Sequence, residues 1–455
     1  MLEKNTYISG WGNFPRIKTT SSRPASIRQL DMEVLSSSSS TIARGMGRSY
    51  GDSSINESQT IFSTKLNLML SFDEDTGELV AEAGVTLVDI LDTFSPRGWF
   101  LSVTPGTKFV SLGGAVASDV HGKNHHFSGS FGNHVLWFDI WTSKSGLVHC
   151  SPTENDDLFW ATVGGHGLTG YITKVAIKLI RIPSLYISQT LTKAANLEEI
   201  MDIFESSHNY PYSVAWIDCL KTGKAMGRSI FMGGDFAQIE DLGKVANKAI
   251  NYRPPMKLNV PFNFPALALN KFSVKLFNFL YYIKSSKSNT KSFVPYDQFF
   301  YPLDSINNWN RIYGRRGFLQ YQFVLPLESS REGLNEILKR IVTLGSGSFL
   351  AVLKLFGDQE IHAGNISFPL KGYTLALDFP ISKSLLDNLT EIDKVVLDFS
   401  GSFYLTKDSR LSGDVFAKSL GNSLDLFKEV KYKWDNREIF SSAQSDRLQI
   451  TSGKC

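Results

Sequence analysis

The sequence predicts an α+β protein in which a glycine-rich first part precedes a large antiparallel sheet covered by helices on one face. The chain has 455 residues, 42% hydrophobic and 20% charged, which is a globular composition. This length suits two domains, or one domain enlarged by insertions. Two later stretches repeat one order of elements: strand, helix, strand, strand, helix. Two such blocks can join edge to edge into one antiparallel sheet with its helices on one face.

The first part of the chain alternates strand patterns with short helical ones. Residues 11–28 are polar and lack a regular period, and the serine run at 36–40 is typical of a surface loop. Apolar residues at helical spacing follow Thr86 and stop before Pro96, so we expect a helix at 86–94 with Thr86 as its N-cap. The other elements expected here are strands at 65–72 and 78–83, a hairpin of strands at 135–142 and 147–150, a helix at 155–163 and a strand at 171–182.

From residue 184 onward the repeated block sets the pattern. The first copy predicts a strand at 185–191, a helix at 197–207, strands at 212–218 and 228–231, and a helix at 242–252. The second copy predicts a strand at 318–326, a helix at 332–344, strands at 349–356 and 373–379, and a helix at 382–399. We therefore expect a separate domain over about 184–400.

Two glycine-rich stretches in the first part indicate a ligand site. Residues 45–54 read GMGRSYGDSS, and residues 103–126 read VTPGTKFVSLGGAVASDVHGKNHH. Glycine lacks a Cβ and tolerates positive φ, so backbone amides can come close to a bound group. Arg48 and the hydroxyls beside it favour a diphosphate in the first stretch. Apolar residues interleaved in the second stretch are not typical of a flexible linker. Together the two stretches predict a seat for a flat or anionic ligand.

A third group of glycines, Gly165, Gly167 and Gly170, matches the pattern GxGxxG. A dinucleotide-binding Rossmann unit requires a strand before this pattern and a helix after it. Here a helix pattern precedes it and a β-branched strand pattern follows. We therefore reject a Rossmann domain, and interpret these glycines as another close approach to a ligand.

The segment between Asp241 and Asp297 contains no acidic residue, whereas nine Lys and Arg residues alternate there with aromatic and aliphatic ones. Two interpretations stay open. The segment either lies on an anionic lipid surface or contains a core helix with a solvated basic face. The formal charge of the whole chain is only +3, so we do not expect a nucleic-acid partner.

The cysteines and the first residues bear on the compartment. Cys150, Cys219 and Cys455 are widely spaced and form no CxxC pair, which predicts free thiols in a reducing compartment and no metal site. Residues 1–10 lack the apolar core of a signal peptide, and no window reaches the roughly 18 apolar residues of a membrane span. We expect a cytoplasmic protein, with peripheral contact at the inner face of the membrane as an open alternative.

Four motifs, taken in order, resemble the FAD-dependent vanillyl-alcohol-oxidase superfamily, whose cofactor domain is of the PCMH type. They are GMGRSYGDSS at 45–54, TPGTKFVSLGGAVASDVHGKNHH at 104–126, GGHGLTGYI at 164–172 and YLTKDSR at 404–410. Within the superfamily, the resemblance is nearest to the flavin oxidases of decaprenylphosphoryl-β-D-ribose. It implies a PCMH-type FAD-binding domain at 1–183, a substrate-binding domain at 184–400 with a basic and aromatic insertion at about 253–296, and a segment at 401–455 that returns to the FAD domain.

The resemblance also implies roles for individual residues. Those expected to hold FAD are Gly45, Gly47, Arg48, Ser49, Tyr50, Gly106, Thr107, Gly113, Gly114, Ala117, Asp119, His121, Gly122, Gly165, Gly167, Gly170, Ile172 and Tyr404. Those expected to contact the substrate are Lys123, Gln320, Gln322, Lys354, Asp378 and Lys407. Lys407, Tyr404 and His121 are the expected catalytic residues.

The implied chemistry moves a hydride from a sugar carbinol carbon to flavin N5 while a base takes the hydroxyl proton. Lys407 can be that base only if its pKa is lowered toward neutrality. We favour Lys407 over His121, because a histidine among glycines beside a flavin more often donates a hydrogen bond. Lys123 and Lys354 are expected to stabilise negative charge on the substrate.

Two positions depart from the family pattern. Many relatives tether FAD to a histidine at the position of Arg48, so we expect non-covalent FAD here. The ribose oxidases carry a cysteine two residues before the aspartate that corresponds to Asp378, whereas this chain has Ala376. Compounds that trap that thiol should therefore not label this protein.

The implied substrate is a polyprenyl-phospho-ribose, oxidised at its 2-hydroxyl as the first half of an epimerisation to the arabinose form for cell-wall arabinan. The keto product would pass to a separate NAD(P)H-dependent short-chain reductase. Two other functions stay open: an oxidase of free alditols or aldonolactones, and a flavin-binding protein without turnover.

Overall fold

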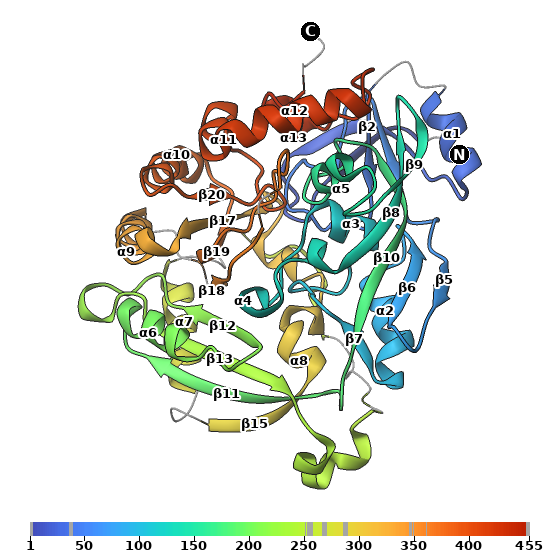
Figure 1. Ribbon diagram of the computed structural model, residues 1–455. Coiled ribbons are helices and arrows are strands. Elements are labelled where there is room, and N and C mark those ends of the chain that lie inside the picture. Colours follow the sequence, from blue (N-terminus) through green and yellow to red (C-terminus); the bar gives the residue numbers. More distant parts are fainter. Residues whose placement is uncertain are drawn as a thin grey trace.

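The computed structural model describes residues 3–35, 40–250, 252, 258–265, 271–284, 290–344, 348, 350–360 and 362–451 (Figure 1). The first part of the chain contributes two sheets. The first has the order β1-β2-β4-β3 and contains β1 (Glu3–Ser9), β2 (Arg16–Ser22), β3 (Thr41–Arg44) and β4 (Gln59–Phe62). The second has the order β5-β6-β10-β8-β9 with β7 also on β10, and contains β5 (Met69–Phe72), β6 (Glu78–Glu82), β7 (Trp99–Leu101), β8 (Val135–Thr142), β9 (Gly146–Cys150) and β10 (Tyr171–Arg181).

The helices of this part are α1 (Ile27–Leu35), α2 (Leu87–Phe94), α3 (Leu112–Ala117), α4 (His125–Ser128) and α5 (Asp156–Thr162). Thr86 caps α2, because its hydroxyl accepts from Asp89 N at 3.2 Å and the Asp89 carboxylate accepts from Thr86 N at 3.0 Å. The predicted hairpin at 135–150 is confirmed. α5 precedes the GxGxxG glycines and β10 follows them, which confirms the order that excludes a Rossmann unit.

The two repeated blocks form one antiparallel sheet, as predicted. Its order is β15-β11-β13-β12-β18-β19-β17-β20, and the blocks meet where β12 pairs with β18. Its strands are β11 (Tyr186–Ala194), β12 (Tyr212–Ile217), β13 (Ser229–Phe236), β15 (Thr290–Pro295), β17 (Phe318–Pro326), β18 (Ala351–Phe356), β19 (Gly372–Pro380) and β20 (Ser402–Phe403). A short parallel pair joins β14 (Leu258–Asn259) to β16 (Ile306–Asn307).

Helices cover one face of this sheet, with α6 (Leu197–Ser206), α9 (Leu327–Leu344) and α10 (Lys383–Asp398) side by side in Figure 1. The apolar residues of β17 that alternate along the strand, such as Leu319 and Phe323, pack with these helices in the largest core. The residues between them point to the opposite face, because side chains of a strand alternate. The remaining helices are α7 (Lys271–Lys284), α8 (Tyr296–Phe300), α11 (Gly413–Leu420), α12 (Asn422–Trp434) and α13 (Ala443–Arg447), with 3₁₀ turns at Ile239–Lys248, Pro302–Ser305 and Trp309–Tyr313.

The C-terminal segment packs on the first glycine-rich loop. Arg447 Nη2 donates to Asp52 Oδ1 and to Asp408 Oδ2, each at 2.9 Å, and Gln444 Nε2 donates to Leu405 O at 2.8 Å. Tyr50 N also donates to Thr406 O at 2.8 Å. Segments about 350 residues apart in sequence are thereby joined at one point. The proposed domain boundaries at 183 and 400 stay predictions.

Several element predictions were wrong in detail. Residues 11–28 contain β2, whose buried hydroxyls hide the strand pattern, because Thr19 Oγ1 pairs with Thr60 Oγ1 at 3.1 Å. Residues 65–68 form no strand, since Leu66 N closes a turn onto Ser63 O. The predicted helix at 242–252 is a 3₁₀ segment at Ile239–Lys248, interrupted by Gly243 with φ 53°. The expectations for residues 36–39, Arg253, Lys257, Lys287 and Cys455 fall outside the described residues.

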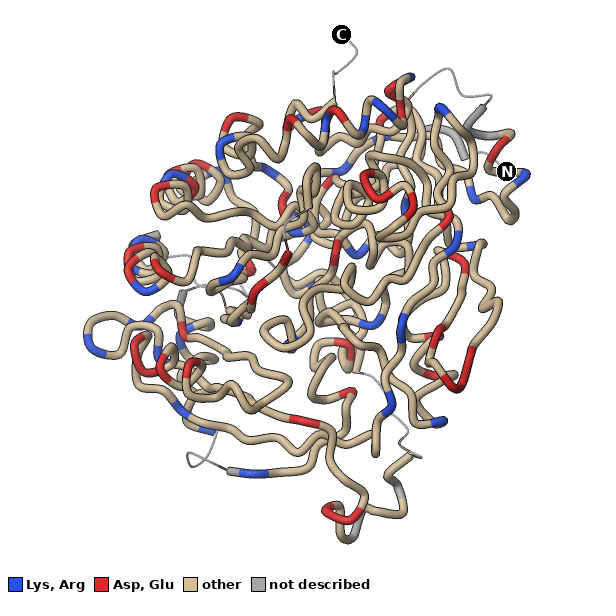
Figure 2. The backbone as a smooth tube through the Cα atoms, viewed as in Figure 1, with Lys and Arg blue, Asp and Glu red and all other residues tan. Residues whose placement is uncertain are grey.

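Charges of both signs are mixed over the outer segments of the molecule (Figure 2). Among the described residues, no helix is both long enough and apolar enough to cross a membrane.

Candidate active site

A cavity of about 520 Å³ lies between the glycine-rich loops and the uncovered face of the large sheet. This volume is in the range of small-molecule sites. The structure brings most of the predicted site residues to its wall, namely Gly45, Gly47, Arg48, Ser49, Tyr50, Gly106, Thr107, Gly113, Gly114, Ala117, His121, Gly122, Lys123, Gly167, Gly170, Ile172, Gln320, Gln322, Lys354, Tyr404 and Lys407. Their roles stay proposals, whereas their convergence on one cavity is a finding.

The first glycine loop follows β3 and places a cation on the cavity wall. Gly47 has φ 63°, and a Cβ there would lie 2.3 Å from Arg44 Nη2, so only glycine fits without a shift. The Arg48 guanidinium lies over the Trp11 ring, 4.1 Å from its centroid. Burial lowers the pKa of Arg48, but a guanidinium remains protonated at neutral pH. The loop can therefore offer positive charge to an anionic ligand.

The residues of the second glycine stretch are compatible with a bound dinucleotide. Gly113 N donates to Ala83 O at 2.8 Å, and a Cβ on Gly113 would lie 2.8 Å from Ala83 Cβ. Ser111 Oγ is buried and has no hydrogen-bond partner among the described residues, although Ser111 lines the cavity. A buried hydroxyl normally has a partner. Glycines on the cavity wall, the Arg48 cation and this hydroxyl fit a flat dinucleotide with a diphosphate.

Three predicted residues lie behind the wall. Gly165 packs on α5, where a Cβ would lie 2.1 Å from Ala161 O. Asp119 accepts from Gly132 N at 2.8 Å and from the Ser367 hydroxyl, so it joins the second stretch to a distant loop. Asp378 accepts from Gln320 Nε2 at 2.5 Å. These residues support the wall but are not part of the cavity lining.

The uncovered face of the large sheet supplies the polar end of the cavity. Gln320 and Gln322 alternate on β17 with residues of the helix-covered core, and Lys354 and Ala376 do the same on β18 and β19. Gln322 pairs with Ala376, and Ala376 pairs with Val352, across three neighbouring strands. The period of two thus brings the side chains of separate strands to one surface.

His121 lies at the centre of this end. Lys354 Nζ is 2.7 Å from His121 Nδ1, and the amide of Gln322 is 3.1 Å from His121 Nε2. Both partner nitrogens carry hydrogens, so the imidazole of His121 has one polar contact at each of its ring nitrogens. Burial, followed by the charge of Lys354, holds the pKa of His121 well below its ordinary value. At neutral pH His121 is therefore uncharged.

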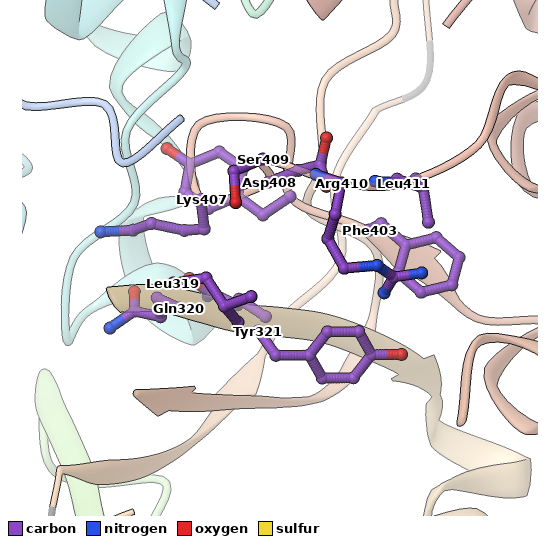
Figure 3. A pocket seen from close by; sticks show the side chains of 11 residues that line it. Leu319, Gln320, Tyr321, Phe403, Lys407, Asp408, Ser409, Arg410 and Leu411 are labelled. Carbon is purple, nitrogen blue, oxygen red and sulfur yellow. Dashed lines mark hydrogen bonds between the residues drawn. The ribbon is translucent and has the colours of Figure 1, made fainter. Parts of the chain in front are cut away.

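Lys407 reaches the same end from the loop that begins at Tyr404. In Figure 3, Lys407 and Gln320 extend to one side of a small pocket, while Tyr321 and Arg410 extend to the other. The Lys407 ammonium lies 4.1 Å from the centroid of the Tyr50 ring. Burial lowers the pKa of Lys407 to about 8, although the charge of Asp378 opposes this shift. A substantial fraction of Lys407 is then neutral near pH 8.

Lys123 and Lys354 complete a set of three amines. Burial lowers the pKa of each to about 7, and the charges of Lys407 and Lys123 add to the effect on Lys354. Lys123 Nζ donates to Phe299 O and lies 4.3 Å from the centroid of the Phe299 ring. An amine whose pKa lies near 7 can hold or release a proton at neutral pH, as the bound group requires.

Several cavity residues were missed at the level of sequence: Trp11, His166, Trp216, Phe277, Tyr281 and Asp304. His166 stands between two of the predicted glycines, and that position was a usable signal. Trp216 alternates on β12 with core residues, so strand periodicity could have found it. Phe277 and Tyr281 come from α7, which belongs to the basic segment rather than to any motif.

Comparison with known proteins agrees with this geometry. Residues 34–151 match the FAD binding domain family. Decaprenylphosphoryl-beta-D-ribose oxidase of Mycolicibacterium smegmatis is 35% identical over 452 residues, 97% of each chain. An uncharacterized protein in the mprA 5′ region of Streptomyces coelicolor is 28% identical over 376 residues, 80% of this chain and all of that one. L-gulonolactone oxidase of Bos taurus is 26% identical over 164 residues, 36% of each chain.

Fold, cavity and family match define a PCMH-type FAD-dependent oxidoreductase. The chain belongs to the family of decaprenylphosphoryl-β-D-ribose oxidase. Its cofactor is FAD, as the sequence motifs predicted.

We expect FAD to leave the protein on denaturation. The family resemblance places Arg48 where many relatives tether the flavin to a histidine, and we expect a guanidinium to form no such bond. Acid precipitation followed by filtration should recover all of the yellow colour in the filtrate. Flavin that stays with the precipitated polypeptide after washing would contradict this prediction, and mass mapping would then locate the bond.

Proposed function

We propose that this protein oxidises the 2-hydroxyl of a polyprenyl-phosphoryl ribose, as the first half of an epimerisation to the arabinose form. The observation that supports this most directly is the set of three amines, Lys123, Lys354 and Lys407, around neutral His121 at one end of the FAD cavity. A phosphorylated sugar carries the negative charge that such a set binds. The similarity to the ribose oxidase over nearly the whole chain supports the same substrate class.

Each residue at the polar end of the cavity has a separate role in the proposed reaction. FAD, when bound, accepts the hydride that leaves the carbinol carbon. Lys407 in its neutral form takes the hydroxyl proton at Nζ, because its lowered pKa places this form within reach near pH 8. Lys354 and Gln322 hold the imidazole of His121 in place through its two ring nitrogens. Gln320 and Gln322 orient the sugar from β17.

The pH dependence of flavin reduction should report Lys407. The base acts when neutral, so the rate should rise with pH and level off above about 8. The negative charge of Asp378 favours protonated Lys407 and raises its pKa. Asp378→Asn should therefore move the rising limb to lower pH in stopped-flow measurements. If the rising limb of the pH–rate curve is unchanged in this variant, Asp378 does not set the pKa of Lys407.

The keto product would require a second enzyme, since a hydride must be returned to the opposite face of the same carbon. We propose an NAD(P)H-dependent short-chain reductase as this partner, in a route to cell-wall arabinan. This step rests on the family of the chain rather than on a surface of the molecule.

The substrate is tested by anaerobic mixing of the purified flavoprotein with polyprenyl-phospho-sugars and with free polyols and aldonolactones. Bleaching of the flavin by the polyprenyl-phospho-ribose alone is the expected result. Bleaching by a free aldonolactone would favour the alternative that L-gulonolactone oxidase represents, although that similarity covers about a third of the chain. Reduction by dithionite and by no sugar would indicate a flavin-binding protein without turnover.

Thiol-directed inhibitors offer a separate test of the cavity wall. Ala376 lines the cavity where the ribose oxidases carry a cysteine, while Cys150 and Cys219 are buried, with pKa raised by burial to about 12. We expect no adduct in the cavity of the native protein and an adduct in Ala376→Cys. Peptide mass mapping locates the label and separates it from any modification of Cys455. Labelling of both proteins at one shared site would contradict the prediction.

A further inference from the structure

α7 turns an apolar face to solvent. Leu276, Phe279, Leu280 and Ile283 are 59%, 45%, 55% and 54% exposed, and they lie on one side of the helix at the spacing of successive turns. An exposed patch of several large apolar side chains is costly in water and marks a contact surface.

This face is held in a fixed orientation by the opposite side of the helix. Val274 is buried in the largest core, which also contains residues of α6, and Asn278 Nδ2 donates to Asp218 Oδ1 at 2.9 Å. The Tyr282 hydroxyl donates to Ala194 O at 3.3 Å, and the Arg228 guanidinium lies 4.5 Å from the centroid of the Tyr282 ring. The apolar face of α7 therefore points outward, because the opposite side of the helix is held by these contacts.

The charges around the apolar face suit an anionic surface. At about 100° per residue, Lys275 and Lys284 project on opposite flanks of the stripe, and both are exposed. No acidic residue occurs between 242 and 296. Apolar side chains flanked by lysines are the pattern of a helix that lies in a lipid interface, with its cations at the headgroups.

The same helix borders the cavity. Phe277 and Tyr281 line it, and the Tyr281 ring lies 4.9 Å from the Trp216 ring on the uncovered face of the large sheet. Val214, Met232 and Val352 continue this apolar wall toward Lys354. An apolar surface thus extends from the exposed helix to the polar end of the cavity.

We propose that α7 docks on an anionic lipid bilayer and that a lipid-linked sugar enters the cavity along Phe277 and Tyr281. This inference deepens the proposed function, because it names the membrane as the source of the substrate. The occupant is a bilayer rather than a protein, since the lysines complement acidic headgroups along the whole length of the face.

The test is flotation of the FAD-loaded full chain with vesicles of phosphatidylcholine, with or without an equal part of phosphatidylglycerol. We expect binding to the anionic vesicles that high salt weakens. Lys275→Gln and Lys284→Gln should each lower it roughly fivefold, and the triple variant Leu276→Ser, Leu280→Ser, Ile283→Ser more than tenfold. The matched control is Leu68→Ser with Leu70→Ser, which removes two exposed leucines elsewhere and should bind as the native protein does.

Flotation requires no turnover, so it is independent of the proposed reaction. Bleaching by a water-soluble short-chain prenyl-phospho-ribose reports that reaction separately and should be equal in the triple variant and the native protein. Binding that is equal for all variants, or no binding to anionic vesicles, would overturn the docking proposal. So would a dimer in sedimentation that the triple variant dissociates, because α7 would then be covered by a second copy. If vesicles bind and no sugar bleaches the flavin, the proposed function fails and the docking surface stands.

Discussion

Lys407→Met is expected to keep the oxidised flavin spectrum and to lower the rate of flavin reduction by the sugar about 10²- to 10⁴-fold, the usual contribution of a general base. The variant removes the amine but keeps an unbranched, slightly shorter side chain, and Lys407 lines the cavity. Its pKa of about 8 is what makes the loss specific, since an ordinary lysine would contribute little as a base. Single-turnover mixing under anaerobic conditions measures the effect.

The control for this variant is Lys394→Met, which removes an exposed lysine of α10 that pairs with Glu391. It should reduce its flavin at the native rate. His121→Gln separates the two candidate bases, because it keeps a polar side chain at this position and removes the imidazole. If Lys407→Met reduces its flavin at nearly the native rate and His121→Gln does not, His121 is the base.

Gly113→Val is expected to yield protein with little or no FAD. A Cβ at this position would lie 2.8 Å from Ala83 Cβ and 3.3 Å from Ala83 O, so α3 must move away from the end of β6. Forced repacking of this kind costs about 1–3 kcal/mol, which corresponds to roughly a fivefold to 150-fold weaker affinity if the cost falls on the bound state. Titration of the apoprotein with FAD, followed by flavin fluorescence, measures the affinity.

Gly146→Ala distinguishes this local effect from general destabilisation. Gly146 has φ 67° in the turn between β8 and β9, and a Cβ there would contact nothing within 4 Å. The substitution should lower the free energy of unfolding by about 1 kcal/mol through backbone strain, while the affinity for FAD stays native. If both variants lose affinity for FAD equally, the close packing at Gly113 has no specific role in FAD binding.

The sheet of the second part could be predicted because each strand carries a buried apolar period and each helix a clear stripe. The register of β17 against β19, which places Gln320 opposite Asp378, is known only from the structure. The glycine loops could be located because glycine is informative where backbone must approach a ligand closely.

Other features depend on contacts between distant segments, and no local pattern records these. Asp119, Gly165 and Asp378 were predicted to touch a ligand, whereas the structure places them one layer behind the wall. The difference between lining a cavity and supporting its lining arises only from tertiary packing. β2 was missed because paired threonine hydroxyls replace the apolar residues that a strand pattern requires. The orientation of α7 also depends on Asn278 reaching Asp218, 60 residues earlier in the chain.

The joint between Asp52, Asp408 and Arg447 has a consequence for biosynthesis. Arg447 joins the loop that follows Lys407 to the first glycine loop, which is made some 400 residues earlier. We therefore expect the cofactor to bind only after the ribosome has made this C-terminal segment. Synthesis of the glycine loops and the appearance of the yellow colour of bound FAD should therefore be separated in time.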